Sequence, residues 1–176
     1  MSACAPRLAY RSGMLPYVVG SAALVLLVAE MTGAFGARAK LPLRVTGWTA
    51  FVFVSALSIY VASRAPHGRK PFAIGFSVSP DDLAWSMTKV AHLRSIAVIF
   101  LLAVLAMGTE RLLAAFGLTM LVGIGWELAE TTVVGHYARV ADLAPNIVSG
   151  TVSLIAIAGI RWILKKRQIR QAAEQT

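Results

Sequence analysis

Charged side chains are scarce in this chain of 176 residues: Asp, Glu, Lys and Arg make up 14% of it, whereas 57% of the residues are hydrophobic. Soluble globular domains carry about 25% charged residues, so this composition excludes an ordinary soluble domain. Cysteine is almost absent, and the single residue, Cys4, excludes a disulfide within the chain. No apolar signal precedes Cys4, so we do not expect lipidation at its thiol.

Acidic residues are also few, since eight Asp and Glu stand against 17 Lys and Arg and the net charge is +9. Such an excess would suggest a nucleic-acid partner in a soluble protein. Here the Lys and Arg flank apolar runs, where basic residues set membrane topology and contact anionic headgroups. Phosphate-binding glycine loops and nucleophile elbows are missing as well. We therefore expect no nucleic-acid partner and no cofactor.

Long apolar runs are what the sequence does contain, and the mean hydropathy is +0.70. A helix needs about 17 to 25 apolar residues to cross a hydrocarbon layer of roughly 30 Å. The sequence predicts one all-α transmembrane domain, 1–176, a polytopic helical bundle of about five transmembrane helices. The predicted spans are about 17–35, 45–62, 88–107, 112–128 and 144–164. The first run is long enough to span, so we expect it to be retained rather than cleaved.

The longest polar segment lies between the second and third spans. Its apolar island, 72–78, is bounded by prolines, which predicts a re-entrant or interfacial loop over 63–80. The sequence Ser79-Pro80-Asp81-Asp82 is typical of a helix start, with a serine cap, proline at the first helical position and acids in the first turn. The third helix is thus predicted to begin as early as Ser79, with its buried part starting at Val90.

Membrane orientation is indicated by the basic residues near the span ends. Placing the C-terminal tail in the cytoplasm divides the 17 Lys and Arg nine to eight. The dense basic run from Lys165 to Arg170 directly after the last span favours this orientation. We expect a multi-pass protein of the bacterial inner (cytoplasmic) membrane with a cytoplasmic C-terminus.

Unusual polar residues occur at three helix ends, and topology places those ends on one membrane face. The second and fourth connections must share a face whichever side is inside. Within each helix end the polar residues are three or four positions apart and so share one helix face. The pairs are Lys89 with His92, Glu127 with Glu130, and Asp142 with Asn146. Because an ionisable group facing lipid costs several kcal/mol, we expect these side chains to converge in a shallow hydrated cluster.

These three elements resemble the VanZ-like membrane proteins. The matching segments are "TKVAHL" at 88–93, "WELAE" at 126–130 and "ARVADLAPNIVSG" at 138–150. Residue by residue, the family pattern falls on Lys89, His92, Glu127, Arg139, Asp142 and Asn146. The resemblance covers roughly the C-terminal half of the chain. It departs from the family at Thr88, where an aspartate is usual, at Glu130, where a glutamine is usual, and at Ser149, which takes the place of the glycine.

The founding activity of that family is reduced susceptibility to teicoplanin-type lipoglycopeptide antibiotics. The resemblance therefore implies a role at the cell envelope, with antibiotic resistance as one outcome. We expect the cluster to lie at the extracytoplasmic interface and to bind or modify a lipid, an envelope precursor or a lipophilic antibiotic. The expected partners are membrane lipids or a lipid-linked or lipophilic small molecule.

Roles can be assigned within this hypothesis. The catalytic candidates are Glu127, as acid or base, with His92 and Asp142, and the binding candidates are Lys89, Arg139, Asn146 and Glu130. The cationic members would receive an anionic headgroup, and Asp142 with Asn146 would orient them. The competing hypothesis is a non-catalytic accessory or assembly subunit of a larger membrane complex, or a homo-oligomer. A small transporter is disfavoured because the chain lacks pseudo-symmetric broken helices.

Several local alternatives remain open. Glu127 and Glu130 could share a proton, hold a divalent metal with His92 or His136, or simply end a helix in water. The metal alternative has no recognised ligand string such as H-E-x-x-H, so no metal is expected. Lys89 with His92 could equally be a cationic helix end reaching for headgroups. His136 and Tyr137 are expected in a loop at the interface.

Outside the cluster, one acid lies within the first predicted span. Glu30 is expected at the opposite membrane face, where Arg38, Arg44 or Arg111 could neutralise it. Small residues such as Gly123 and Gly150 are typical of close helix packing in membranes.

Overall fold

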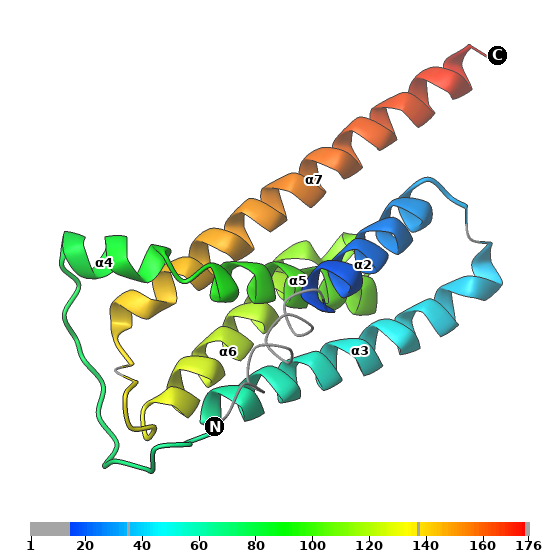
Figure 1. Cartoon of the computed structure of the whole chain (residues 1–176). Coiled ribbons are helices and arrows are strands. Elements are labelled where there is room, and N and C mark those ends of the chain that lie inside the picture. The colour runs from blue at the N-terminus through cyan, green and yellow to red at the C-terminus, as the bar shows by residue number, and fades with distance from the viewer. Residues whose placement is uncertain (1–14, 35, 137, 175–176) are drawn as a thin grey trace, which may run out of the picture.

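The computed structural model describes residues 15–34, 36–136 and 138–174 (Figure 1). Within these ranges it contains six α-helices and no strand, which confirms the all-α class. The helices are α2 (Leu15–Met31), α3 (Ala37–Ser63), α4 (Pro80–Met87), α5 (Val90–Met107), α6 (Leu112–Glu130) and α7 (Leu143–Ala173). Short 3₁₀ turns at Thr109–Arg111 and Val140–Asp142 precede α6 and α7. Cys4 and Tyr137 lie outside the described residues.

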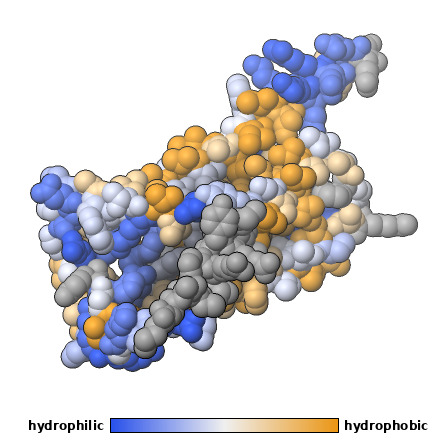
Figure 2. All heavy atoms as spheres, in the orientation of Figure 1, coloured by the Kyte–Doolittle hydropathy of each residue, from blue (hydrophilic) through white to orange (hydrophobic). Residues whose placement is uncertain are grey.

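Four of these helices, α3, α5, α6 and α7, are long and apolar enough to cross a membrane. The described part of α2 is apolar but shorter, with 17 residues. Their outer faces carry exposed apolar side chains, and Figure 2 shows hydrophobic residues around the middle of the molecule with hydrophilic residues towards its ends. The chain is therefore a multi-pass membrane protein.

Two helices are longer than their predicted spans. Helix α3 begins at Ala37 rather than at 45 and includes Pro42, whose missing N–H weakens only the start of the helix. Helix α7 continues to Ala173 because its last turns are rich in Lys, Arg, Gln and Ala, which favour helix in water. Charge ends a hydrophobic span without ending a helix.

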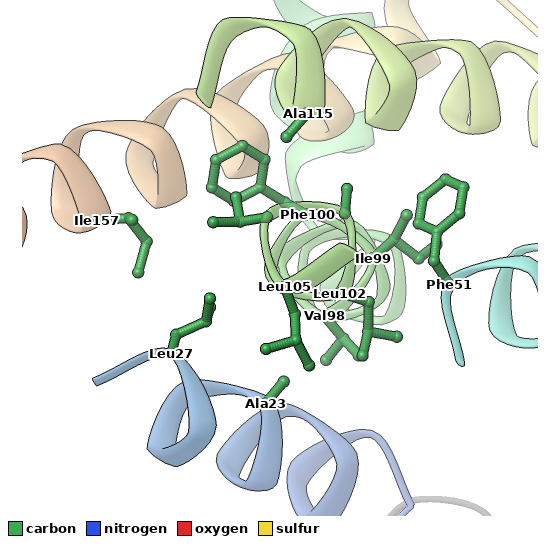
Figure 3. Packing of buried hydrophobic residues seen from close by; sticks show 12 residues of the cluster. Ala23, Leu27, Phe51, Val98, Ile99, Phe100, Leu102, Leu105, Ala115 and Ile157 are labelled. Carbon is green, nitrogen blue, oxygen red and sulfur yellow. The ribbon is translucent and has the colours of Figure 1, made fainter. Parts of the chain in front are cut away.

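Helix α5 forms the centre of the bundle and packs against α2, α3, α6 and α7. Figure 3 shows its apolar side chains radiating towards the neighbouring helices, with Phe100 and Ile99 fully buried. Gly47 of α3 meets the backbone of α5, and a Cβ at position 47 would lie 2.6 Å from Ala106 N. Only glycine allows this approach, which fixes α3 against the central helix.

At the C-terminal end of α5, two arginines bind two glutamates and two backbone carbonyls. Arg44 binds the Glu30 carboxylate through both terminal nitrogens and donates to Leu105 O at 2.7 Å. Arg161 pairs with Glu110 and donates to Thr109 O. The expectation that a nearby arginine neutralises Glu30 is thus confirmed, with Arg44 as the partner.

At the N-terminal end of α5, residues 64–79 form an extended strap that lies against the α6–α7 connection. The strap is joined to it by backbone bonds from Lys70 N to Thr132 O and from Gly75 N to Ala138 O, each 2.9 Å long. Val140 N in turn donates to Gly75 O at 2.9 Å. The two connections therefore meet, as the topology requires, and bring the start of α5 close to the end of α6 and the start of α7.

Candidate functional site

The first side of the site is a break between α4 and α5. Ser79 caps α4 as predicted, its hydroxyl accepting from Asp82 N at 3.1 Å, but the helix ends at Met87. Lys89 takes a non-helical conformation, with ψ of 68°, before α5 begins at Val90. The prediction of one continuous third helix from Ser79 is therefore wrong. Neither glycine nor proline marks the break, so the sequence gives no local signal for it.

Lys89 is held in this conformation by an ion pair with Asp142. This carboxylate is fully buried and accepts from Ser86 Oγ at 2.7 Å and from Arg139 N at 3.2 Å. Lys89 Nζ lies 2.8 Å from Asp142 Oδ1. A buried carboxylate is stable only with such partners, so Asp142 fixes α4, the α4–α5 break and the start of α7 relative to one another. Its oxygens are thus committed to positioning.

Arg139 binds a different carboxylate from the one its sequence neighbourhood suggests. Its guanidinium pairs with Asp82 of α4, whereas the Asp142 carboxylate accepts from the backbone N–H of Arg139. Asp82 also accepts from Ser77 Oγ at 2.6 Å and from Ser79 Oγ at 2.8 Å. Hydrogen bonds from Ser77 and Ser79, with a smaller contribution from the positive charge of Arg139, lower the pKa of Asp82 to about 2. Asp82 therefore anchors both the strap and Arg139.

His92 lies between the two glutamates of α6. His92 Nδ1 is 3.3 Å from Glu127 Oε1, and His92 Nε2 is 3.9 Å from Glu130 Oε1. The imidazole also packs on Trp126, with ring centroids 4.6 Å apart. His92, Glu127 and Glu130 are 8%, 6% and 8% exposed, so the contacts form away from bulk water. A histidine held between two carboxylates is well placed to bind or transfer a proton.

Glu130 is not a solvated helix end, although it is the last residue of α6. Trp126 Nε1 donates to its Oε1 at 2.8 Å, and His136 Nδ1 lies 3.4 Å from its Oε2. His136 is accordingly part of the cluster, while its side chain remains 53% exposed. The interpretation of Glu130 as a helix end in water does not fit these contacts.

The deepest part of the site holds polar groups that no group of the chain satisfies. In the described ranges, neither oxygen of Glu127 and neither amide atom of Asn146 has a hydrogen-bond partner within the protein. Asn146 is 2% exposed and packs on Gly123 of α6, where a Cβ would lie 3.0 Å from Asn146 Nδ2. An amide inside a membrane helix usually bonds across helices, whereas that of Asn146 has no such bond among the described residues. Unsatisfied buried polar groups are costly, and sites that bind ligands are where proteins retain them.

Two cavities open beside these residues. The larger, of about 500 Å³, is bordered by Lys89, His92, Glu130, His136 and Arg139 together with Trp85. The smaller, of about 180 Å³, lies under the strap and is mainly apolar, with Glu127 and Arg139 as its charged residues. Arg139 borders both cavities. The site thus has a chamber lined by ionisable side chains, called the polar chamber, and an apolar one, and Arg139 is common to both walls.

The cations of the polar chamber are already paired. Lys89 is bound to Asp142 and Arg139 to Asp82, and both lie over the Trp85 ring, at 5.1 and 5.5 Å from its centroid. An ammonium has three donors and a guanidinium five, so each retains hydrogen-bonding capacity. Among the described residues, no group of three or more His, Cys, Asp or Glu side chains is arranged to hold a metal ion.

All seven predicted site residues gather at this end of the bundle, in two linked groups. His92, Glu127 and Glu130 form the inner group, and Asn146 of α7 packs on Gly123, one helical turn before Glu127 on α6. Lys89, Asp142 and Arg139 form the outer group. Sequence reasoning missed Asp82, Ser86 and Trp126. Asp82 and Ser86 belong to a capped eight-residue helix whose docking on the start of α7 has no signature in the sequence.

No family model, curated protein or solved structure matches this chain. The geometry of the site therefore carries the functional argument.

Proposed function

We propose that this chain is a VanZ-like membrane protein that binds the polar head of an amphipathic molecule in the paired cavities. The observation that carries the proposal is that Arg139 borders both a chamber of about 500 Å³ lined by ionisable side chains and a mainly apolar one of about 180 Å³. A polar head and the first part of its apolar chain need adjacent spaces of those two kinds. Lipids, lipid-linked envelope precursors and lipophilic antibiotics all have this character.

The polar chamber presents donors and acceptors on different sides. An anionic group of the ligand would bind the remaining N–H groups of Lys89 and Arg139. A hydroxyl or ammonium group would donate to Glu130, whose partners in the chain are Trp126 and His136. The pairing of Lys89 and Arg139 with buried or half-buried carboxylates holds both cations at the chamber wall, so little side-chain entropy is lost when the ligand binds.

If the bound molecule is modified, His92 is the residue that contacts it. His92 borders the larger cavity, whereas Glu127 lies behind it and borders only the smaller one. Glu127 would orient the imidazole through Nδ1, 3.3 Å away, and leave Nε2 facing the chamber as acid or base. This division of roles refines the assignment of Glu127 as the acid or base.

We place the site at the extracytoplasmic face of a bacterial inner membrane. Support comes from the basic run after the last span, which favours a cytoplasmic C-terminus. Helix α7 has 31 residues and a length of about 46 Å, so its basic last turns extend past the hydrocarbon layer on the side opposite the cavities.

The proposal is tested in a deletion strain by a lipid profile and by sensitivity to lipoglycopeptide antibiotics. We expect Glu127→Gln and His92→Gln to insert normally and yet fail to restore the deletion phenotype. The matched controls are Glu174→Gln and His67→Gln, which make the same chemical changes at exposed positions and should restore it. If both site variants complement as well as the controls, the proposed function is wrong.

An accessory subunit is the second candidate, and the sparse packing of α7 favours it. In the most apolar stretch of this helix, only 17% of the residues are buried within the described part of the chain. Gly123 and Gly150 face α6 side chains or Asn146, so bulky changes there would disturb internal packing. Gly159 has no neighbour within 4 Å of an added Cβ and is the better probe. A subunit interface on this face predicts that Gly159→Leu abolishes stoichiometric copurification with a partner while the site variants do not.

A further inference from the structure

We infer that the opposite end of the bundle holds a second binding site, for the phosphate group of an anionic phospholipid. This inference does not depend on the proposed function of the paired cavities. The site is a cavity of about 320 Å³ formed where α2 ends, α3 begins and α7 passes the α5–α6 turn. Its charged wall consists of Glu30, Lys40, Glu110, Arg161 and Lys165.

Two cations of this wall, Lys40 and Lys165, are not paired with its carboxylates. Glu30 is bound by Arg44, and Glu110 is bound by Arg161, so both carboxylates are neutralised by arginines. Arg161 also donates to Thr109 O, which holds it at the turn. Lys40 and Lys165 have no hydrogen bond or ion pair with any residue in the described ranges. The cavity therefore presents two uncommitted ammonium groups to an anion.

The cavity lies at the depth of lipid headgroups. Trp162 is 64% exposed one residue from Arg161, and Lys166 Nζ lies 5.2 Å from its ring centroid. An exposed tryptophan with a neighbouring lysine is typical of the membrane interface. Met31 and Leu164 complete the wall on the apolar side. A phosphate bound by the two lysines would thus leave its acyl chains in the bilayer.

The arginines and lysines of this cavity differ in what they can bind. The arginines are fixed by carboxylates and backbone carbonyls, whereas the lysines are exposed and able to follow a mobile headgroup. Gln168 Nε2 lies 3.5 Å from Met31 O and closes α7 over the end of α2. Basic pockets between transmembrane helices are a known way to hold phospholipid headgroups. The geometry fits a phosphodiester better than a soluble polyanion, because Lys40 and Lys165 are the only unpaired cations among the described residues of the cavity wall.

Two adjacent lysines provide a matched test. Lys165 lines the cavity, whereas Lys166 lies over Trp162 and does not. The full chain in detergent is titrated with phosphatidylglycerol or phosphatidylcholine, and bound lipid is counted by native mass spectrometry. We expect retention of phosphatidylglycerol alone, reduced roughly fivefold by Lys165→Gln or Lys40→Gln and unchanged by Lys166→Gln. Lys165→Arg should retain binding, and an excess of inorganic phosphate should not displace the lipid.

Equal losses in Lys165→Gln and Lys166→Gln would overturn the inference, since they would indicate adsorption governed by net charge. Displacement by inorganic phosphate would overturn it too, because the site would then select a free anion. Both lysines are exposed, so the variants should fold, and thermal unfolding in detergent verifies this independently of lipid binding.

Discussion

The two ends of α5 use buried charge in opposite ways. At its C-terminal end, Arg44 binds the Glu30 carboxylate and the carbonyl of Leu105, so each buried group has a partner. At its N-terminal end, the Asn146 amide has no hydrogen bond among the described residues, and the Glu127 carboxylate has only the His92 imidazole, 3.3 Å away, as an ion-pair partner there. Satisfied charge holds helices together, whereas unsatisfied buried polarity costs stability and is retained at sites that bind something else. The comparison separates the end whose buried charges are paired, here called the structural end, from the end that holds the candidate site, here called the functional end.

The largest expected effect is at the structural end. Arg44→Ala leaves Glu30, whose side chain is 10% exposed, without its counter-charge. We expect a loss of about 3 kcal/mol in the free energy of unfolding, because a buried charge without a partner is costly. Thermal unfolding in detergent measures it. The double variant with Glu30→Gln should recover most of the loss, and no recovery would mean that Arg44 acts mainly through Leu105 O.

Asp142→Asn is the corresponding change within the functional end. It removes the ion pair with Lys89 while leaving an oxygen that can accept from Ser86. We expect a loss of about 2 kcal/mol, because Ser86 keeps its acceptor, whereas the amide nitrogen in place of Oδ2 cannot accept from Arg139 N. The same unfolding assay applies. A stability equal to that of the unaltered chain would show that Asp142 does not hold the α4–α5 break in place.

Glu127→Gln should be nearly neutral in stability. Apart from His92 Nδ1, 3.3 Å from Oε1, its oxygens meet no donor among the described residues, and the Gln oxygen can keep that contact, so the expected change is within about 1 kcal/mol of zero. Glu30→Gln makes the same chemical change at the other end and should be clearly destabilising, because it removes the Arg44 pair. Measuring the two variants side by side tests the comparison directly, and equal losses would remove the distinction between the ends.

The smallest effect is the pH dependence of the strap. The pKa of Asp82 is lowered from 3.8 to about 2, so its carboxylate favours the folded state above pH 3.8 and this contribution is lost as the pH falls towards 2. Amide hydrogen exchange at Val140, which donates to the strap at Gly75, should therefore speed up between about pH 4 and 2. Asp82→Asn should remove that transition, and a transition that persists in the variant would assign it to another group.

Prediction from the sequence succeeded for features that depend only on the order of residues along the chain. Apolar runs marked the membrane-spanning helices, and topology placed Lys89, Glu127 and Asp142 at one end of the bundle. It failed at the α4–α5 break and at the contacts of Glu130. Both depend on what a side chain meets in space: Lys89 leaves the helix to reach Asp142, and Glu130 is covered by Trp126 and His136. Such contacts join residues of separate elements, and no local pattern records them.

The sequence by itself determined the long apolar helices, because a hydrocarbon layer accepts only long apolar segments and places charge at their ends. Only the tertiary structure decided which charges pair. Arg139 binds Asp82 of α4 rather than its neighbour Asp142, and His92 takes its place between two glutamates of α6. Long polar side chains can reach many partners, so the choice depends on the rotation of each helix about its axis, and the packing around α5 sets that rotation.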